Sequence, residues 1–229
     1  MIQFSSVYKS YTRGEYALED VSFKINKGEF FFVTGHSGAG KTTLLKLITK
    51  EIKPTKGAIL IEGKNISVLS DSKIYKFRRE IGIVFQDFRL LEERTVFENV
   101  ALSLKIRGLP IRRIKKEVLE ALRWVGIHQK IWNKTKTLSG GEQQRVAIAR
   151  AIVSNPKIIL ADEPTGNLDE EISYEIMEMF KRLNSRGATI VIATHDKLIL
   201  ERYAKKNNIL VLQKGKIKQL IKRDENLFA

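Results

Sequence analysis

The sequence of 229 residues contains no cysteine. A disulfide framework and a cysteine-based zinc site are therefore both excluded. Histidine is scarce as well, because the chain has only three and none of them lies four residues from another. A helix could not present two of them to one metal ion, so a histidine-rich metal site is not expected. A chain of this length can bury a sizeable core without such cross-links.

Long hydrophobic runs are also missing. The longest apolar stretches, such as Phe30–Val33 and Ile158–Ala161, are far shorter than the roughly 20 residues that a membrane-spanning helix needs. The first residues lack a basic segment followed by an apolar one, the pattern typical of a secretory signal. These absences predict a soluble, cytoplasmic protein.

Acidic residues are few relative to basic ones: 26 Asp and Glu face 41 Lys and Arg, for a net charge of +15. Such an excess can attract nucleic acid, a phospholipid surface or an acidic protein. It can also belong to a lysine-rich, well-solvated surface, which is the simplest interpretation. Charge of this kind bears on association and solubility and says nothing about the fold.

Alternating strands and helices dominate the pattern outside the middle of the chain. The first thirty residues alternate like antiparallel strands, with turns near Thr12–Glu15 and at 26–28. The later strands are short continuous apolar runs, typical of strands buried on both faces. Strands are predicted at 30–34, 58–61, 81–85, 157–161 and 188–193, with helices at 41–50 and 170–183 and a hairpin of 209–212 with 216–221. This order predicts a mainly parallel sheet covered by helices.

The section from about 87 to 155 has a helical pattern instead. Apolar residues recur at helical spacing between Ile111 and Val125, Gly126 follows as a stop signal, and Asn155-Pro156 ends the section. We therefore predict one α/β domain, 1–229. Its core comprises about 1–86 and 156–229, with an antiparallel β subdomain at the N-terminus, and a helical subdomain of about 87–155 is inserted.

A glycine-rich loop lies between the strand at 30–34 and the helix that begins at Lys41. It fits the phosphate-loop pattern G-x-x-x-x-G-K-[ST], whose glycines let backbone N–H groups surround phosphate oxygens at a helix N-terminus. Lys41 would reach the β- and γ-phosphates, and the Thr42 hydroxyl would ligate Mg²⁺. The motif alone leaves kinase, GTPase and ATPase open. The predicted nucleotide-binding residues are Gly35, His36, Ser37, Gly38, Ala39, Gly40, Lys41, Thr42 and Thr43.

Two adjacent acids, Asp162 and Glu163, follow the apolar strand at 157–161. The carboxyl ends of strands in an open α/β sheet border its ligand crevice. Asp162 is therefore placed to hold Mg²⁺ through water, and Glu163 is the better candidate for the general base that polarises a water in line with the γ-phosphate. An acid in this place suits hydrolysis better than transfer to a bulky acceptor.

The segment Leu138–Arg145 resembles the signature motif of ABC ATPases. Ser139 suits a helix N-cap, and Gly140 and Gly141 leave free N–H groups at that helix end, so the chain has a second candidate anion site. The resemblance implies a head-to-tail homodimer in which the phosphate loop of one copy and Ser139–Glu142 of the other enclose ATP with Mg²⁺.

Other positions match the family pattern in order. The resemblance implies that Gln86 contacts Mg²⁺ and the attacking water, that Asp169 lies in a loop crossing the dimer interface, and that His195 contacts the γ-phosphate. It also implies an aromatic residue stacked on adenine. Both Tyr11 and Tyr16 suit that role by position, and Tyr11 is the first choice.

Within the family, the chain is most similar to the cell-division branch, on the residues Thr34–Lys41, Phe85–Leu91 and Ala161–Asp169. Lipoprotein-release and macrolide-export ATPases share the last of these stretches, so His36 is the more distinctive residue. That similarity implies an FtsX-type integral membrane permease as partner, which would meet the chain at about 87–97. It also implies a peripheral place on the cytoplasmic side of the inner membrane and control of periplasmic cell-wall hydrolases. An ATPase subunit of a lipoprotein-release or macrolide exporter is the alternative, and no nucleic acid is expected as a partner.

Overall fold

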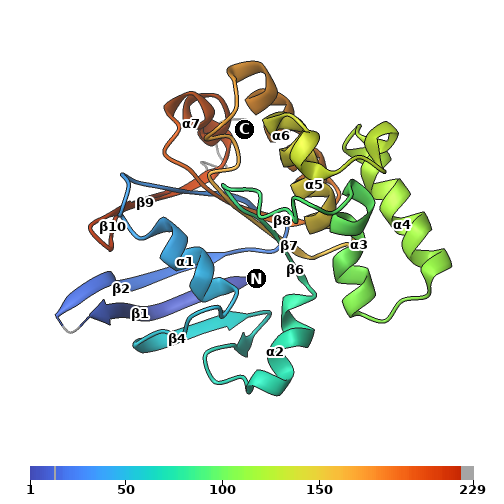
Figure 1. The fold of residues 1–229 in the computed structure, drawn as a ribbon. Helices are drawn as coiled ribbons and strands as arrows, with labels where there is room; N and C mark the ends of the chain where they lie inside the picture. Colours follow the sequence, from blue (N-terminus) through green and yellow to red (C-terminus); the bar gives the residue numbers. More distant parts are fainter. Residues whose placement is uncertain (13, 223–229) are drawn as a thin grey trace.

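The computed structural model describes residues 1–12 and 14–222, and it folds them into two sheets with helices around them (Figure 1). The strands are β1 (Ile2–Thr12), β2 (Glu15–Ile25), β3 (Phe30–Thr34), β4 (Lys56–Ile61), β5 (Lys64–Asn65), β6 (Ile81–Val84), β7 (Ile158–Asp162), β8 (Thr189–Ala193), β9 (Asn208–Gln213) and β10 (Lys216–Ile221). The α-helices are α1 (Lys41–Ile48), α2 (Asp71–Arg78), α3 (Val96–Ile106), α4 (Ile111–Trp124), α5 (Gly140–Ile152), α6 (Glu170–Ser185) and α7 (Lys197–Tyr203). Short 3₁₀ turns lie at His128–Lys130, Thr135–Thr137 and Ala204–Lys206.

The first sheet has the strand order β2-β1-β4-β5 and is antiparallel throughout. Ile2 of β1 faces Ile25 on one side and Ile61 on the other, so the strand at the N-terminus lies inside this sheet. The antiparallel beginning predicted from the alternation is confirmed. The turn predicted near Thr12–Glu15 includes residue 13, which lies outside the described residues.

The second sheet has the order β10-β9-β3-β8-β7-β6 and is parallel except for β10. Strand β3 shows why its apolar run has no alternation. Phe30 and Phe32 pack into the core that the helices α3 to α6 share with this sheet. Phe31 and Val33 pack into a second core with α1 and the first sheet. Both faces of the strand are buried, as the continuous run predicted.

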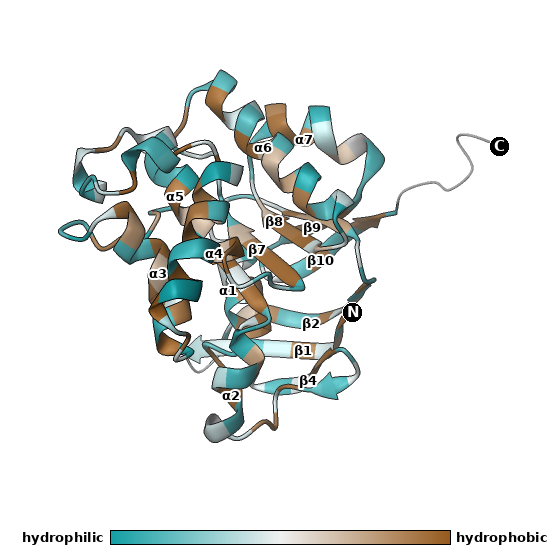
Figure 2. Cartoon of the chain, turned by 90° about the vertical axis from the view of Figure 1, so that its right-hand side faces the viewer, coloured by the Kyte–Doolittle hydropathy of each residue, from teal (hydrophilic) through white to brown (hydrophobic). Residues whose placement is uncertain are grey.

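The section predicted to be helical contains α3, α4 and α5, which lie together at one side of the molecule (Figure 1). Helix α4 buries the stripe formed by Ile114, Val118 and Leu122. Its chain then turns at Gly126 with φ 76°, a conformation that glycine adopts at low cost. In Figure 2, which is coloured by hydropathy, α3 is largely hydrophobic, whereas hydrophilic residues predominate along α4 with hydrophobic ones between them.

Two surface helices were not predicted from the sequence. None of the described side chains of α2 is buried, and only Ile74 and Phe77 are half-buried, so its apolar stripe is too short to predict a helix. Helix α7 is only seven residues long, and Asp196 begins it by accepting hydrogen bonds from the amides of Leu198 and Ile199. In the part of the chain that the structure describes, every helix is too short or too polar to cross a membrane.

Candidate active site

The glycine-rich loop joins β3 to α1 and approaches other backbone very closely. A Cβ atom built on Gly35 would lie 2.3 Å from the carbonyl oxygen of Leu212 in β9, so no larger residue fits there. Gly40 has φ 106° and directly precedes α1, whose first residues are Lys41, Thr42 and Thr43. The unpaired N–H groups of a helix N-terminus therefore face the loop, which makes it a binding place for anions.

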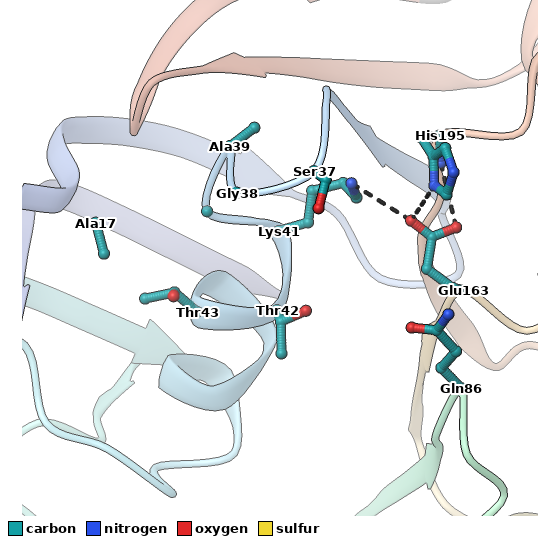
Figure 3. Close-up of a pocket in the computed structure, with 11 residues that line it drawn as sticks. Ala17, Ser37, Gly38, Ala39, Lys41, Thr42, Thr43, Gln86, Glu163 and His195 are labelled. Atoms are coloured by element: carbon teal, nitrogen blue, oxygen red, sulfur yellow. Dashed lines mark hydrogen bonds and ion pairs between the residues drawn. The ribbon is translucent and has the colours of Figure 1, made fainter.

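The side chain of Lys41 is buried and folds back over the loop. Its Nζ donates a hydrogen bond to the carbonyl oxygen of Gly35 at 2.8 Å and a weaker one to that of His36 at 3.4 Å. The same Nζ lies 3.3 Å from Oε1 of Glu163 and forms an ion pair with it, although the two residues are far apart in the chain. The dashed lines of Figure 3 mark this pair. A positive charge is thus held at the phosphate loop by groups that an anionic ligand can replace.

Glu163 directly follows β7 and holds a left-handed backbone conformation, with φ 46°. Its amide donates to the carbonyl oxygen of Ala193 at 2.8 Å, which fixes it to the end of β8. Its Oε1 lies 2.7 Å from Nδ1 of His195, and its Oε2 accepts from the His195 amide at 3.3 Å. Glu163 is 8% exposed, whereas the ring of His195 is 62% exposed. One carboxylate therefore links a buried lysine to a solvent-facing histidine (Figure 3).

These residues line one cleft of about 260 Å³ (Figure 3). It brings together the phosphate loop, the end of β6 with Gln86, the end of β7 with Glu163 and the end of β8 with His195. The residues around it are Ala17, Ser37, Gly38, Ala39, Gly40, Lys41, Thr42, Thr43, Gln86, Glu163 and His195. Gly35 and the exposed His36 belong to the same loop but are not among these residues.

Asp162 is the last residue of β7 and lies next to α1. Its Oδ1 is buried and has no hydrogen-bond partner among the described residues. The pKa of this carboxyl is raised above its ordinary value, mainly because the group is buried. The hydrogen bond with the Thr42 hydroxyl lowers the pKa in part, and the nearby charge of Glu163 raises it. A buried carboxylate oxygen without a partner, on a carboxylate that is hydrogen-bonded to a hydroxyl, offers oxygen donors of the kind that suit a hard cation such as Mg²⁺.

The two tyrosines that competed for the adenine-binding role lie differently. The Tyr11 hydroxyl lies 3.4 Å from Oγ1 of Thr43, a residue of the cleft, and most of the Tyr11 ring is exposed. Tyr16 instead packs edge-on against Tyr8, with ring centroids 5.6 Å apart. Of the two rings, Tyr11 is the one that reaches the phosphate-loop helix.

The signature segment forms the start of α5 and not the cleft. Ser139 is the N-cap: its hydroxyl accepts from the amide of Glu142, and the Glu142 carboxylate accepts from the Ser139 amide at 3.1 Å. Lys130 also binds Glu142, and these hydrogen bonds, with that from Lys130 foremost, lower the pKa of its carboxyl. Gly141 lies against α6, because a Cβ there would come within 2.9 Å of Cγ2 of Ile172. Ser139, Gly140, Gly141 and Glu142 thus form a second, separate helix N-terminus.

Asp169 has a local structural role in the isolated chain. It is the N-cap of α6, and its Oδ1 accepts a hydrogen bond from the Ile172 amide at 2.9 Å. Leu168, its neighbour, lies beside Gly140, since a Cβ on that glycine would be 3.6 Å from Cδ2 of Leu168. The loop before α6 and the signature end of α5 therefore pack against each other.

Sequence reasoning missed two residues of this region. Ala17 lines the cleft through its backbone position at the end of the first sheet, and no feature of the sequence indicates that. Gln144 is fully buried and donates to the carbonyl oxygen of Pro164 at 2.6 Å, one residue after Glu163. The side chain of its neighbour Gln143 points elsewhere, because its Nε2 donates hydrogen bonds to the carbonyl oxygens of Thr135 and Leu138. The helical period could have indicated that the two glutamines face different ways.

The cleft, the carboxylate and the separate signature helix together define a nucleotide-hydrolysing cassette, and comparison with known proteins agrees. The sequence model of the ABC transporter family matches residues 18–166. The chain belongs to this family, and it is an ATPase that binds and hydrolyses ATP. The expected α/β fold of this class is confirmed by the solved structures that it resembles.

Among individual proteins, the chain is 48% identical over 226 residues to the cell division ATP-binding protein FtsE of Bacillus subtilis, covering 99% of this chain and 96% of that protein. It superposes on the dimeric structure of MJ0796, a bacterial ABC transporter cassette, with a TM-score of 0.89, 39% identity and coverage of 97% and 98%. A post-hydrolysis dimer of MJ0796 bound to ADP and Pi gives a TM-score of 0.88, 38% identity and the same coverage.

Proposed function

We propose that this chain is the ATPase subunit of a membrane-bound cell-division complex and that two copies share their active sites head to tail. The observation that supports sharing is the separation of the two helix N-termini. One faces the cleft with Lys41, while the other, at Ser139–Glu142, lies on α5 outside the residues that line the cleft. A second copy can supply that end to the cleft of the first, and the MJ0796 cassettes were solved as dimers.

Hydrolysis then follows from the contacts of Lys41 and Glu163. The two side chains form a buried ion pair in which each neutralises the other. When ATP enters, its β- and γ-phosphates offer Lys41 a stronger partner, so the Glu163 carboxylate is released to face a water molecule. That water attacks the γ-phosphorus and transfers a proton to Glu163 while the bond from the γ-phosphorus to the bridging β-oxygen breaks. His195, already bonded to Glu163, contacts the γ-phosphate from the other side.

The remaining residues bind and orient the nucleotide. Residues 35–43 surround the phosphates, Tyr11 stacks on adenine, and Ser139–Glu142 with Asp169 come from the partner copy. Thr42, Gln86 and Asp162 would hold Mg²⁺, because Asp162 has a buried oxygen without a partner and Thr42 adds a hydroxyl. A bound Mg²⁺ would neutralise charge on the β- and γ-phosphates. Closing two copies around ATP also excludes other water from the site.

The membrane partner would be a permease of the FtsX type, with regulation of periplasmic cell-wall hydrolases as the output. The relatives that carry the cell-division name support this assignment over an exporter. The section 87–97, where the partner would dock, has apolar residues at its surface: Leu91 is 46% exposed, and Trp132, packed on Phe97, is 67% exposed. The partner would thus hold the chain on the cytoplasmic side of the inner membrane. Nucleic acid has no part in this proposal.

A co-purification experiment tests this proposal. The chain is co-expressed with a tagged FtsX-type permease, and the same is done with Leu91→Ser plus Trp132→Ser. We expect the wild type to co-purify and the double variant to be lost from the complex while its own ATP turnover persists. Val68→Ser, which removes an even more exposed apolar side chain elsewhere, serves as the control. Retention of the double variant at the wild-type level would argue against this docking site.

A further inference from the structure

The turn between α3 and α4 carries the densest positive charge that the motifs leave unexplained. Residues 105–116, named here the basic turn, contain six cations and no acid. They lie at the end of the α3–α4 pair, at the lower right edge of Figure 1. The cations are Lys105, Arg107, Arg112, Arg113, Lys115 and Lys116, and all six are exposed.

Few of these charges are neutralised by neighbours. Arg113 pairs with Glu117 at 3.5 Å, and Lys116 lies 3.9 Å from Glu120. The other four form no ion pair with any residue that the structure describes. Exposed pairs of this kind contribute little, so most of the positive charge remains available to an external anionic partner.

Two large apolar side chains protrude among the cations. Ile106, the last residue of α3, is 73% exposed, and Ile111, the first residue of α4, is 58% exposed. The turn that presents them is rigid: Gly108 takes φ 73°, Pro110 caps α4, and Leu104 and Ile114 anchor both sides in the core. Side chains held in this way lose little conformational entropy when they bind.

We propose that the basic turn binds the surface of an anionic phospholipid membrane, with its cations at the headgroups and with Ile106 and Ile111 in the interface. Cations around exposed aliphatic side chains are the composition that interfacial binding selects. Single-stranded nucleic acid would instead favour aromatic residues for stacking, and the basic turn has none. The proposal adds a direct lipid contact to the peripheral membrane place proposed above, and it is tested without the permease.

The test measures binding of the full chain to vesicles of phosphatidylglycerol in phosphatidylcholine, with pure phosphatidylcholine vesicles as the reference. The triple variant Lys105→Gln, Arg107→Gln, Arg112→Gln should bind the anionic vesicles roughly a hundredfold more weakly, at about a factor of five per cation. The double variant Ile106→Ser, Ile111→Ser should bind the anionic vesicles roughly tenfold or more weakly, because less apolar surface is buried in the interface. Its charge is unchanged, so this loss should remain at low salt.

Matched controls remove the same groups elsewhere. Lys27, Lys53 and Lys64 are exposed and unpaired among the described residues, so their triple glutamine variant has the same net charge as the first variant. Val68→Ser removes an exposed apolar side chain outside the turn. Both controls should bind vesicles like the wild type. All variants should hydrolyse ATP at the wild-type rate. ATP hydrolysis and vesicle binding are measured independently, so failure of the ATPase assignment can be distinguished from failure of the lipid-binding proposal.

Three results would overturn the proposal. One is an equal loss in the two triple variants, which would mean that only net charge matters. Another is wild-type binding by the isoleucine double variant, which would mean that nothing enters the interface. The third is a loss of DNA binding, with vesicle binding intact, in the basic-turn variants, which would assign the surface to nucleic acid.

Discussion

Lys41 and Glu163 form a buried ion pair, with 3.3 Å between Nζ and Oε1 and both side chains 8% exposed. Each side chain is a charged partner of the other. Removing one partner of a buried pair leaves the other charge uncompensated, which costs more than the pair contributes. The pair therefore helps to hold both side chains in place at the cleft.

Complementation between two inactive variants tests whether the sites are shared. Lys41→Ala should fail to hold the phosphates, and Ser139→Arg should block the signature end, so each homodimer should be inactive. In a mixed dimer, one of the two composite sites combines two intact halves. We expect an equimolar mixture to regain up to about a quarter of wild-type phosphate release, from half of the dimers with one intact site each. No recovery at any ratio, with wild-type turnover by isolated monomers, would refute shared sites.

Glu163→Gln should separate binding from hydrolysis. The amide keeps the shape of the carboxylate but cannot accept the proton of the attacking water, so turnover should fall by at least about 100-fold. Because ATP is bound and not consumed, the variant should accumulate as a dimer in size-exclusion chromatography with Mg·ATP, and it should stay monomeric with ADP. A variant that hydrolyses ATP at the wild-type rate would remove Glu163 from the reaction.

Gly140 and Gly141, the first two residues of α5, differ in the space that is available for a larger side chain. A methyl group on Gly141 would lie 2.9 Å from Cγ2 of Ile172 and must displace it, whereas on Gly140 it would lie 3.6 Å from Leu168, an ordinary contact. Gly141→Ala should lower the free energy of unfolding by about 1–3 kcal/mol. Gly140→Ala should leave it unchanged or raise it by about 0.5 kcal/mol, since alanine favours the helix. Urea unfolding of both variants measures the difference.

Gln144 is expected to position Glu163 through the backbone. Its Nε2 holds the carbonyl oxygen of Pro164, while its own Oε1 is buried without a partner among the described residues. Gln144→Met removes the unsatisfied oxygen but also leaves the buried Pro164 carbonyl oxygen without this donor, so the free energy of unfolding should fall by about 1–3 kcal/mol. The loop after β7 would lose its tether, and kcat should fall several-fold with KM for ATP unchanged. A parallel rise in KM would mean that the whole cleft had shifted.

Tyr203 makes stability depend on alkaline pH. Its hydroxyl donates to Oε1 of Glu178 at 3.1 Å, and burial followed by this hydrogen bond and the Glu178 charge raises the pKa of the phenol to about 12. An unfolded tyrosine titrates near pH 10. The stabilisation is therefore complete below pH 10 and is lost as pH rises from about 10 through 12. Unfolding of wild type and Tyr203→Phe across this window should show the steeper decline in the wild type.

Much of the candidate site could be predicted because its parts are contiguous. The phosphate loop, the acids after β7 and the signature segment are each a short run whose residue types and spacing carry the chemistry. The two helices missed, α2 and α7, lack a buried stripe or are short, so no periodic signal exists for them. The inward direction of Gln144 and the cleft contact of Ala17 depend on neighbours that are distant in the chain.

The sequence by itself determined the strands buried on both faces and the helical character of the section between β6 and β7, because these depend on local patterns of side chains. The phosphate-binding role of residues 35–43 is a prediction from the same kind of pattern. Only the tertiary structure decided that Lys41 meets Glu163, that Tyr11 and not Tyr16 reaches Thr43, and that two isoleucines protrude from the basic turn. Such contacts join residues far apart in the chain. They arise when sheets and helices pack, and no local pattern encodes their distance or exposure.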